Sequence, residues 1–190
     1  MRDRAPGNKI AAMTDESAPP LSLRIVSALT SRHYRVRGDS MKPDFDAGQL
    51  LLVSYAAYSA TSPFRGDVVV MRDPRGTGKH YLKRLVSMPG ETVSFIDGVL
   101  LIDGRPLGEP YLGGLPAILG LDRHEWTLGP GEYFAMGDNR SHSTDSSDYG
   151  PLSAEDIIGK AWFRYWPIGK FGVVRGGSPP SQPSPDWGKG

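Results

Sequence analysis

From Tyr34 onward, short apolar and β-branched runs alternate with turns rich in Gly, Pro and Asp. The runs at residues 49–54, 67–71, 80–87 and 92–102 have the length and composition of β-strands. Within the last run, Asp97-Gly98 separates two apolar halves, the pattern of a tight β-hairpin, and Asp103-Gly104 marks the next turn. Residues 125–128, 133–136 and 157–165 continue the pattern, so we expect a mostly β domain.

The other segments lack this pattern. Residues 1–20 are polar and contain prolines, and we expect them to be disordered; residues 21–33 suggest a short helix or the remnant of an anchor region. The main domain spans residues 34–175, with a hairpin and loop insertion at about 92–132. Within it, residues 107–123 are rich in Gly, Pro and Leu and predict a loop that leaves the core. Residues 153–156 predict one capped turn, and residues 176–190 a disordered tail.

Composition narrows the function classes. The 190 residues suffice for one domain with a core, and 22 basic against 21 acidic residues give a net charge of +1, so no nucleic-acid partner is expected. The absence of cysteine excludes cysteine-protease, thiol-redox and disulfide chemistry. The four histidines lack metal-ligand spacing, and we expect neither a metal nor a cofactor. No segment approaches the ~20 apolar residues of a spanning helix, and no secretory signal is visible.

A candidate nucleophile, Ser40, stands in the segment Val36-Arg37-Gly38-Asp39-Ser40-Met41-Lys42-Pro43. Gly38 permits backbone angles that other residues avoid, and Pro43 biases the residue before it toward an extended conformation. Such a segment can hold one hydroxyl at the end of a strand, pointing into a cleft. Taken alone, it is more typical of an ordinary turn.

A candidate base lies in the predicted strand at residues 80–87. Alternation places Lys83 on one face with Tyr81 and Leu85. Burial on an apolar face favours the neutral amine, which can act as a general base near a hydroxyl. The alternative is a lysine whose stem is buried and whose charged end reaches water.

Four segments in order carry a family resemblance: Gly38-Asp39-Ser40-Met41-Lys42-Pro43, Gly66-Asp67-Val68-Val69-Val70, Lys83-Arg84-Leu85-Val86-Ser87-Met88-Pro89-Gly90-Glu91, and residues 137–151, which begin Gly137-Asp138-Asn139-Arg140. They resemble motifs of the type I signal peptidase (leader peptidase) family, membrane-surface serine proteases with a Ser/Lys dyad. The resemblance covers roughly residues 34–174 and implies coiled antiparallel β-sheets with few short helices.

The resemblance implies roles for individual residues. Ser40 would be the nucleophile, with its backbone N–H in the oxyanion hole, and Lys83 the base. Ser143 would hydrogen-bond the Lys83 amine, and Asp145 would brace the loop. Two departures stand out: Gly38 replaces a serine that supplies a second oxyanion donor in some members, and Ser147 replaces an arginine that commonly pairs with the aspartate. We expect Arg140 or Arg84 to substitute for that arginine.

Small substrate pockets would be lined by four apolar residues, which are equally consistent with ordinary core: Val36, Met41, Phe45 and Leu82. Asp44-Phe45 replaces the commoner Thr-Leu and would change the pocket floor.

The resulting hypothesis is a serine endopeptidase that cleaves signal peptides from exported preproteins after small residues, at a membrane surface with an extracytoplasmic active site. The family's usual membrane anchor is not visible, which fits either a trimmed chain or an unanchored relative. Alternatives are a soluble self-cleaving repressor-type Ser/Lys protease, an inactive relative that binds peptides, and a triad that uses His80 or His142.

Overall fold

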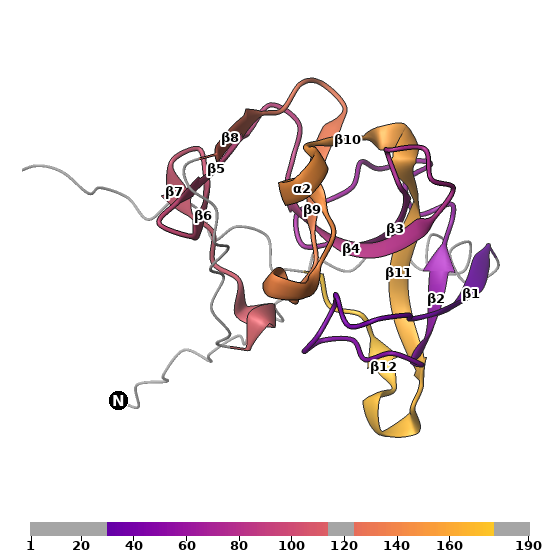
Figure 1. The fold of residues 1–190 in the computed structure, drawn as a ribbon. Coiled ribbons are helices and arrows are strands. Elements are labelled where there is room, and N and C mark those ends of the chain that lie inside the picture. Colours follow the sequence, from indigo (N-terminus) through magenta and orange to yellow (C-terminus); the bar gives the residue numbers. More distant parts are fainter. Residues whose placement is uncertain (1–29, 114–123, 177–190) are drawn as a thin grey trace, which may run out of the picture.

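The computed structural model describes residues 30–113 and 124–176, which form two antiparallel sheets (Figure 1). The large sheet has the strand order β1-β2-β11-β3-β4-β9-β10, with β12 paired to β11, and the small sheet has the order β7-β6-β5-β8. The strands are β1 (Ser31–Arg35), β2 (Leu50–Ser54), β3 (Val68–Arg72), β4 (His80–Ser87), β5 (Thr92–Ile96), β6 (Val99–Ile102), β7 (Arg105–Pro106), β8 (His124–Thr127), β9 (Glu132–Met136), β10 (Leu152–Ser153), β11 (Ile157–Trp166) and β12 (Gly172–Val173).

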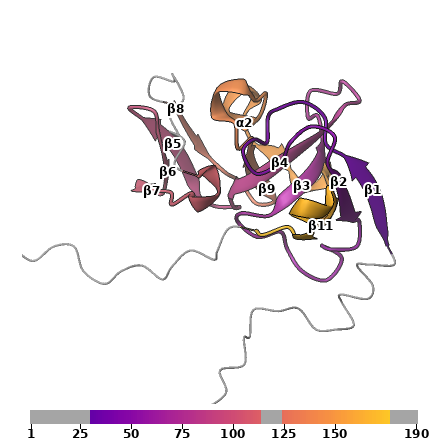
Figure 2. The ribbon, with the colours of Figure 1, turned by 90° about the horizontal axis from the view of Figure 1, so that it is seen from below.

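Both faces of the large sheet are covered. Along β3, Val68 and Val70 pack into one core cluster, whereas Val69 and Met71 pack into another, as the two-residue alternation of a strand requires. A third cluster joins β4 and β9 to the small sheet through residues such as Val86 and Phe95. The small sheet therefore packs beside the large one through a shared core, as two perpendicular views show (Figures 1 and 2). Register shifts in β11 fit a strand that bends across the sheet.

The mostly β prediction is confirmed, and several elements match closely. The strand predicted at residues 80–87 is β4. The hairpin between β5 and β6 turns at Asp97 and Gly98, which have φ angles of 51° and 77°. Positive φ at both positions is what a two-residue hairpin turn needs, and Asp-Gly favours it. The capped turn at residues 153–156 is also present, with the Ser153 side chain accepting from the Glu155 N–H.

Two predictions differ from the structure. Residues 31–33 were expected to end a short helix, but they lie in β1, where pairing with β2 supplies their backbone hydrogen bonds. Residues 107–113 were expected to leave the core, but Leu112 is buried and its neighbours contact the core. The expectations for residues 1–20, 21–29, 114–123 and 177–190 lie outside the described residues.

The helices of the described residues are short: α2 (Ser146–Tyr149) and the single 3₁₀ turns η1 (Pro110–Leu112), η2 (Arg140–His142), η3 (Ala154–Asp156) and η4 (Ile168–Lys170). In the part of the chain that the structure describes, no helix has both the length and the apolar character needed to cross a membrane.

Candidate active site

Ser40 lies in a tight loop between β1 and β2. The loop is closed by the Phe45 N–H, which donates to the Met41 carbonyl at 2.8 Å, and Gly38 enters it with a left-handed φ of 70°. The Ser40 carbonyl accepts from the Asn139 N–H at 3.0 Å, but its own N–H and hydroxyl bond to no other described residue. The nucleophile candidate is thus fixed through its backbone carbonyl, while its two donors stay available.

Lys83 lies in the middle of β4, only 1% exposed. Its Nζ donates to Ser143 Oγ at 2.9 Å and lies 5.7 Å from the centre of the Tyr81 ring. Burial lowers the pKa of the Lys83 amine to about 8, against the opposing charges of Asp145 and two further carboxylates. With this pKa, about a tenth of the amine is unprotonated at pH 7 and about half at pH 8.

Gly137 lies between the Ser40 loop and Ser143, the residue that binds Lys83. It follows β9, and a Cβ built on it would lie 2.6 Å from the Ser143 Cβ, and closer still to Ser143 Oγ and the Ser40 carbonyl oxygen. Only a residue without a side chain fits between them. The Gly137 backbone thus separates the loop of Ser40 from the hydroxyl that holds Lys83.

Asp145 holds the Gly137 backbone in place. It is buried, and its Oδ2 accepts from the Gly137 N–H at 2.8 Å. Its Oδ1 accepts from the backbone N–H of Ser147 at 3.1 Å and from the Ser147 hydroxyl at 2.8 Å, and Asp148 completes a capping box at the start of α2. The hydroxyl and backbone N–H of Ser147 therefore bind Asp145, the role that the resemblance gives to an arginine at this position.

The two arginines proposed as substitutes have other partners, so that expectation is wrong. Arg84 is fully buried, forms a bidentate pair with Asp138 at 2.9 and 2.8 Å, and reaches Asp44 at 2.8 Å. Burial is the largest single influence on the Arg84 pKa and lowers it, but Asp138, together with Tyr111 and Asp44, raises the pKa of the guanidinium overall. Arg140 pairs with Glu109. Arg84 and Asp138, both in the motifs, thus form a buried ion pair beside the site.

The four residues suggested as pocket lining, Val36, Met41, Phe45 and Leu82, all belong to one buried core cluster. Their pocket role stays a prediction. The Asp44-Phe45 exchange has a visible effect: Phe45 fills the core, and Asp44 joins the Arg84 ion pair.

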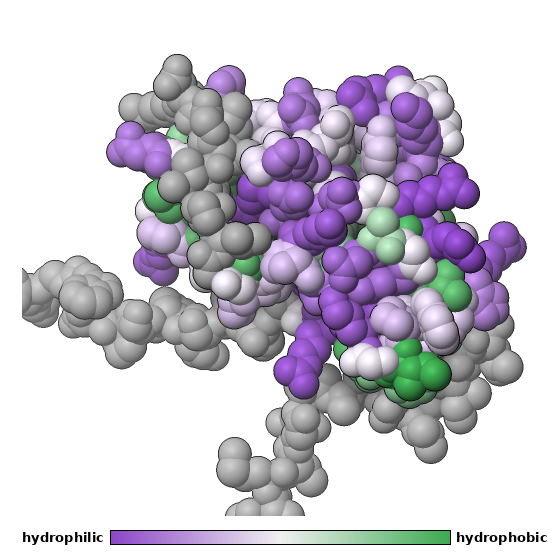
Figure 3. Space-filling view, turned by 60° about the horizontal axis from the view of Figure 1, so that its bottom comes forward, coloured by the Kyte–Doolittle hydropathy of each residue, from purple (hydrophilic) through white to green (hydrophobic). Residues whose placement is uncertain are grey.

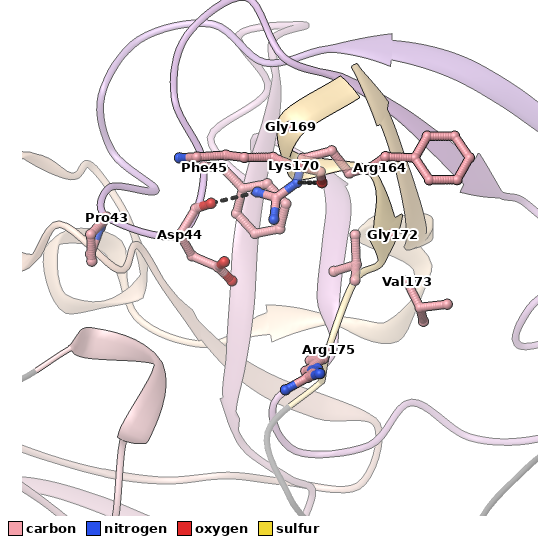
Figure 4. A pocket seen from close by; sticks show the side chains of 11 residues that line it. Pro43, Asp44, Phe45, Arg164, Gly169, Lys170, Gly172, Val173 and Arg175 are labelled. Atoms are coloured by element: carbon pink, nitrogen blue, oxygen red, sulfur yellow. Dashed lines mark hydrogen bonds between the residues drawn. The ribbon is translucent and has the colours of Figure 1, made fainter. Parts of the chain in front are cut away.

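A cavity of about 730 Å³ lies on the other side of this loop (Figure 4). Pro43, Asp44 and Phe45 line it together with the β11–β12 region, and Arg164 crosses it to donate to the Asp44 carbonyl at 2.7 Å. Neither Ser40 nor Lys83 lines this cavity.

The two histidines considered as alternative bases, His80 and His142, make no hydrogen bond to Ser40 in the part of the chain that the structure describes. His80 is exposed at the start of β4, and the His142 ring bonds to the Ser141 hydroxyl at 2.8 Å. Within residues 30–113 and 124–176, neither imidazole bonds to Ser40 or to a carboxylate.

The site thus combines a serine with available donors and a buried lysine whose pKa is depressed, a combination suited to acyl transfer. Comparison with known proteins agrees. The sequence model of the family described as "Signal peptidase, peptidase S26" matches residues 20–166. The chain belongs to this family.

Two relatives, of known sequence, give the same result. The chain is 33% identical over 176 residues to a probable signal peptidase I-1 of Synechocystis, covering 84% of this chain and 86% of that protein. It is 36% identical over 163 residues to signal peptidase I T of Bacillus subtilis, covering 78% and 83%. A crystal structure of a signal peptidase I from Enterococcus faecalis matches with a TM-score of 0.46 and 31% identity, covering 53% of this chain and 97% of that one.

Proposed function

We propose that this chain, a serine endopeptidase of the signal peptidase family, cleaves signal peptides with Ser40 as nucleophile and Lys83 as general base. The observation that carries the proposal is the buried Lys83 amine, held by Ser143 and spaced from the Ser40 loop by Gly137. A lysine can serve as a base near neutral pH only if its pKa is depressed, and that of Lys83 is about 8.

The reaction divides into two acyl transfers. Ser40 Oγ attacks the scissile carbonyl carbon while the neutral Lys83 amine takes the hydroxyl proton. The C–N bond then breaks as the Lys83 ammonium returns that proton to the leaving amine. Water, deprotonated by the same amine, attacks the acyl-enzyme ester and releases the acid and the Ser40 hydroxyl.

The oxyanion of each tetrahedral intermediate would accept from the Ser40 N–H, which has no other acceptor among the described residues. Gly38 contributes no side-chain donor: the space where its Cβ would project is empty within 4 Å, and its positive φ favours glycine. Ser143 orients the amine, and Asp145 holds the Gly137 backbone.

The substrate would be the signal peptide of a preprotein with small residues before the cut, and the family is associated with membranes. An exposed apolar surface supports approach to a membrane. Four side chains of the 166–173 hairpin are more than half exposed: Trp166, Ile168, Phe171 and Val173. Figure 3 shows a hydrophobic patch at the lower right of the molecule, with smaller ones elsewhere, and exposed apolar side chains of this kind suit contact with a lipid surface. Lys170 of the hairpin is paired with Asp46 at 2.8 Å.

Cleavage of an internally quenched peptide with Ala at the first and third positions before the cut tests the proposal. Ser40→Ala and Lys83→Ala should abolish cleavage, whereas His80→Ala and His142→Ala should retain most of it. In the parent, kcat/KM should rise with pH through about 8 as Lys83 loses its proton. A matched peptide with Leu at both positions should be cut far more slowly.

Three results would contradict the proposal. Parental activity in Ser40→Ala would exclude that nucleophile. Loss of activity in a folded histidine variant would transfer the base role. Complete absence of cleavage by the parent would favour the peptide-binding alternative.

A further inference from the structure

Glu109 lies outside the four sequence motifs, yet it is tied to the centre of the site. It precedes η1, in the segment that follows β7. Its carboxylate pairs with the Arg140 guanidinium: Nη1 donates to Oε2 at 2.8 Å, and Nη2 donates to Oε1. The two side chains are only 2% and 4% exposed. Burial is the largest single influence on the Arg140 pKa and lowers it, but Glu109, together with Tyr111 and Asp138, raises the pKa of the guanidinium overall.

Arg140 transmits this contact to Gly137. While its two terminal nitrogens bind Glu109, its Nε donates to the Gly137 carbonyl at 3.1 Å. The opposite side of the same residue is fixed by Asp145, which accepts from the Gly137 N–H. Gly137 is therefore held from two sides at the position where it separates Ser40 from Ser143.

The segment around Glu109 contacts all three parts of the site. The Tyr111 hydroxyl donates to Glu109, and its ring lies under the Arg84 guanidinium, 4.0 Å from ring centre to Cζ. A Cβ built on Gly113 would lie 3.8 Å from Pro43 Cγ, three residues after Ser40. The segment is thus anchored to the Ser40 loop, to β4 and to the loop after β9.

We propose that Glu109 is a positioning residue for peptide cleavage: through Arg140 it fixes the Gly137 backbone, which sets the spacing between Ser40 and the Ser143–Lys83 pair. The inference rests on the proposed function. It predicts a specific defect, because misplacement by about 1 Å can slow a reaction ~100-fold without weakening substrate binding.

The test compares Glu109→Gln with Glu125→Gln in the full chain, using the quenched alanine peptide. Glu125 is exposed in β8, and its side chain has no hydrogen bond or ion pair within the described residues. Glu109→Gln should lower kcat by roughly 10- to 100-fold with KM within about threefold of the parent. Glu125→Gln should match the parent in both constants.

Glu109→Asp guards against a folding defect, since it keeps the charge that neutralises buried Arg140 but shortens the reach by one methylene. It should fold and lie between the parent and Glu109→Gln in kcat. Arg140→Lys should also lower kcat, and adding Glu109→Gln to it should cost little more, because both changes break the same link.

Two outcomes separate this inference from the proposed function. If folded Glu109→Gln or Glu109→Asp has the parental kcat, while Ser40→Ala is inactive, Glu109 only stabilises its segment and the inference is wrong. If Ser40→Ala cleaves as fast as the parent, the proposed function fails and the inference fails with it. A lowered melting temperature with unchanged kcat also refutes positioning.

Discussion

Replacing Lys83 with methionine tests the depressed pKa of the candidate base through its effect on the free energy of unfolding. The side chain keeps similar length and an apolar stem but loses the group that titrates. The Lys83 pKa falls from an ordinary 10.5 to about 8 in the folded chain, with burial as the main cause. One pKa unit corresponds to about 1.4 kcal/mol, so keeping this amine charged in the folded state costs roughly 3 kcal/mol.

The sign of the effect depends on pH. Between pH 8 and 10.5 the unfolded chain binds more protons at this group than the folded chain, so the contribution of Lys83 to stability rises with pH through that window. Below the folded pKa the penalty is fully present, and above the unfolded value it disappears.

Lys83→Met removes the penalty but also the hydrogen bond to Ser143, a loss of about 1 kcal/mol because half-buried Ser143 can bind water instead. At pH 7 the variant should therefore be inactive yet more stable than the parent by roughly 1–3 kcal/mol. The advantage should shrink toward pH 10.

Urea unfolding of both proteins at pH 7 and pH 10 measures the difference, with Lys79→Met as the matched control. Lys79 is exposed just before β4, so its replacement should change stability by no more than about 0.5 kcal/mol at either pH. A Lys83→Met variant clearly less stable than the parent at pH 7 would mean that Lys83 is charged and usefully paired. The base would then have to be sought elsewhere.

Two further variants test the site and its surroundings. Gly137→Ala should lose peptide cleavage by about 100-fold and be destabilised by about 1–3 kcal/mol, because its Cβ would collide with Ser143 and the Ser40 carbonyl; parental activity would exclude the proposed spacing. Ile168→Asp/Phe171→Asp should weaken co-sedimentation with anionic phospholipid vesicles while cleavage of the soluble peptide stays parental, and unchanged binding would exclude this hairpin as the membrane contact.

The elements predicted from sequence were those whose cause is local. The β4 strand and the β5–β6 hairpin follow from apolar alternation and from Asp-Gly at the turn. The peripheral strands β1 and β12 were not predicted, because they are short or polar and form mainly through pairing with β2 and β11. The α2 helix was missed for lack of any hydrophobic period, although Asp145-x-x-Asp148 carried the capping pattern.

In the site too, local motifs could be predicted from the sequence, whereas contacts between distant segments could not. The motifs located Ser40, Lys83, Ser143 and Asp145, and the structure gives the Lys83–Ser143 and Asp145–Gly137 contacts. The role of Ser147 depends on its place in the first turn of α2. Glu109 could not be found from sequence, because it meets Arg140 across 31 positions and nothing near it marks a partner.

The surroundings of Lys83 and Arg84 show how the site can lower the pKa of one cation while acidic residues hold the other charged. Neighbours in a strand point to opposite faces, so the two cations are buried in different surroundings. On one face, Asp138 and Asp44 bind Arg84 directly and hold it charged. On the other, Lys83 has a hydroxyl as its hydrogen-bond acceptor and no ion pair among the described residues, and carboxylates act on it only through space.

A carboxylate in direct contact with Lys83 would raise the pKa of its amine and remove the base. Arg84 helps to prevent this because a buried Asp138 is satisfied best by the bidentate guanidinium. The Lys-Arg pair of the motif therefore has a physical reason. Arg84 binds Asp138 and Asp44 on its own face, and Asp145 is satisfied by Gly137 and Ser147, so Lys83 keeps a hydroxyl as its hydrogen-bond partner.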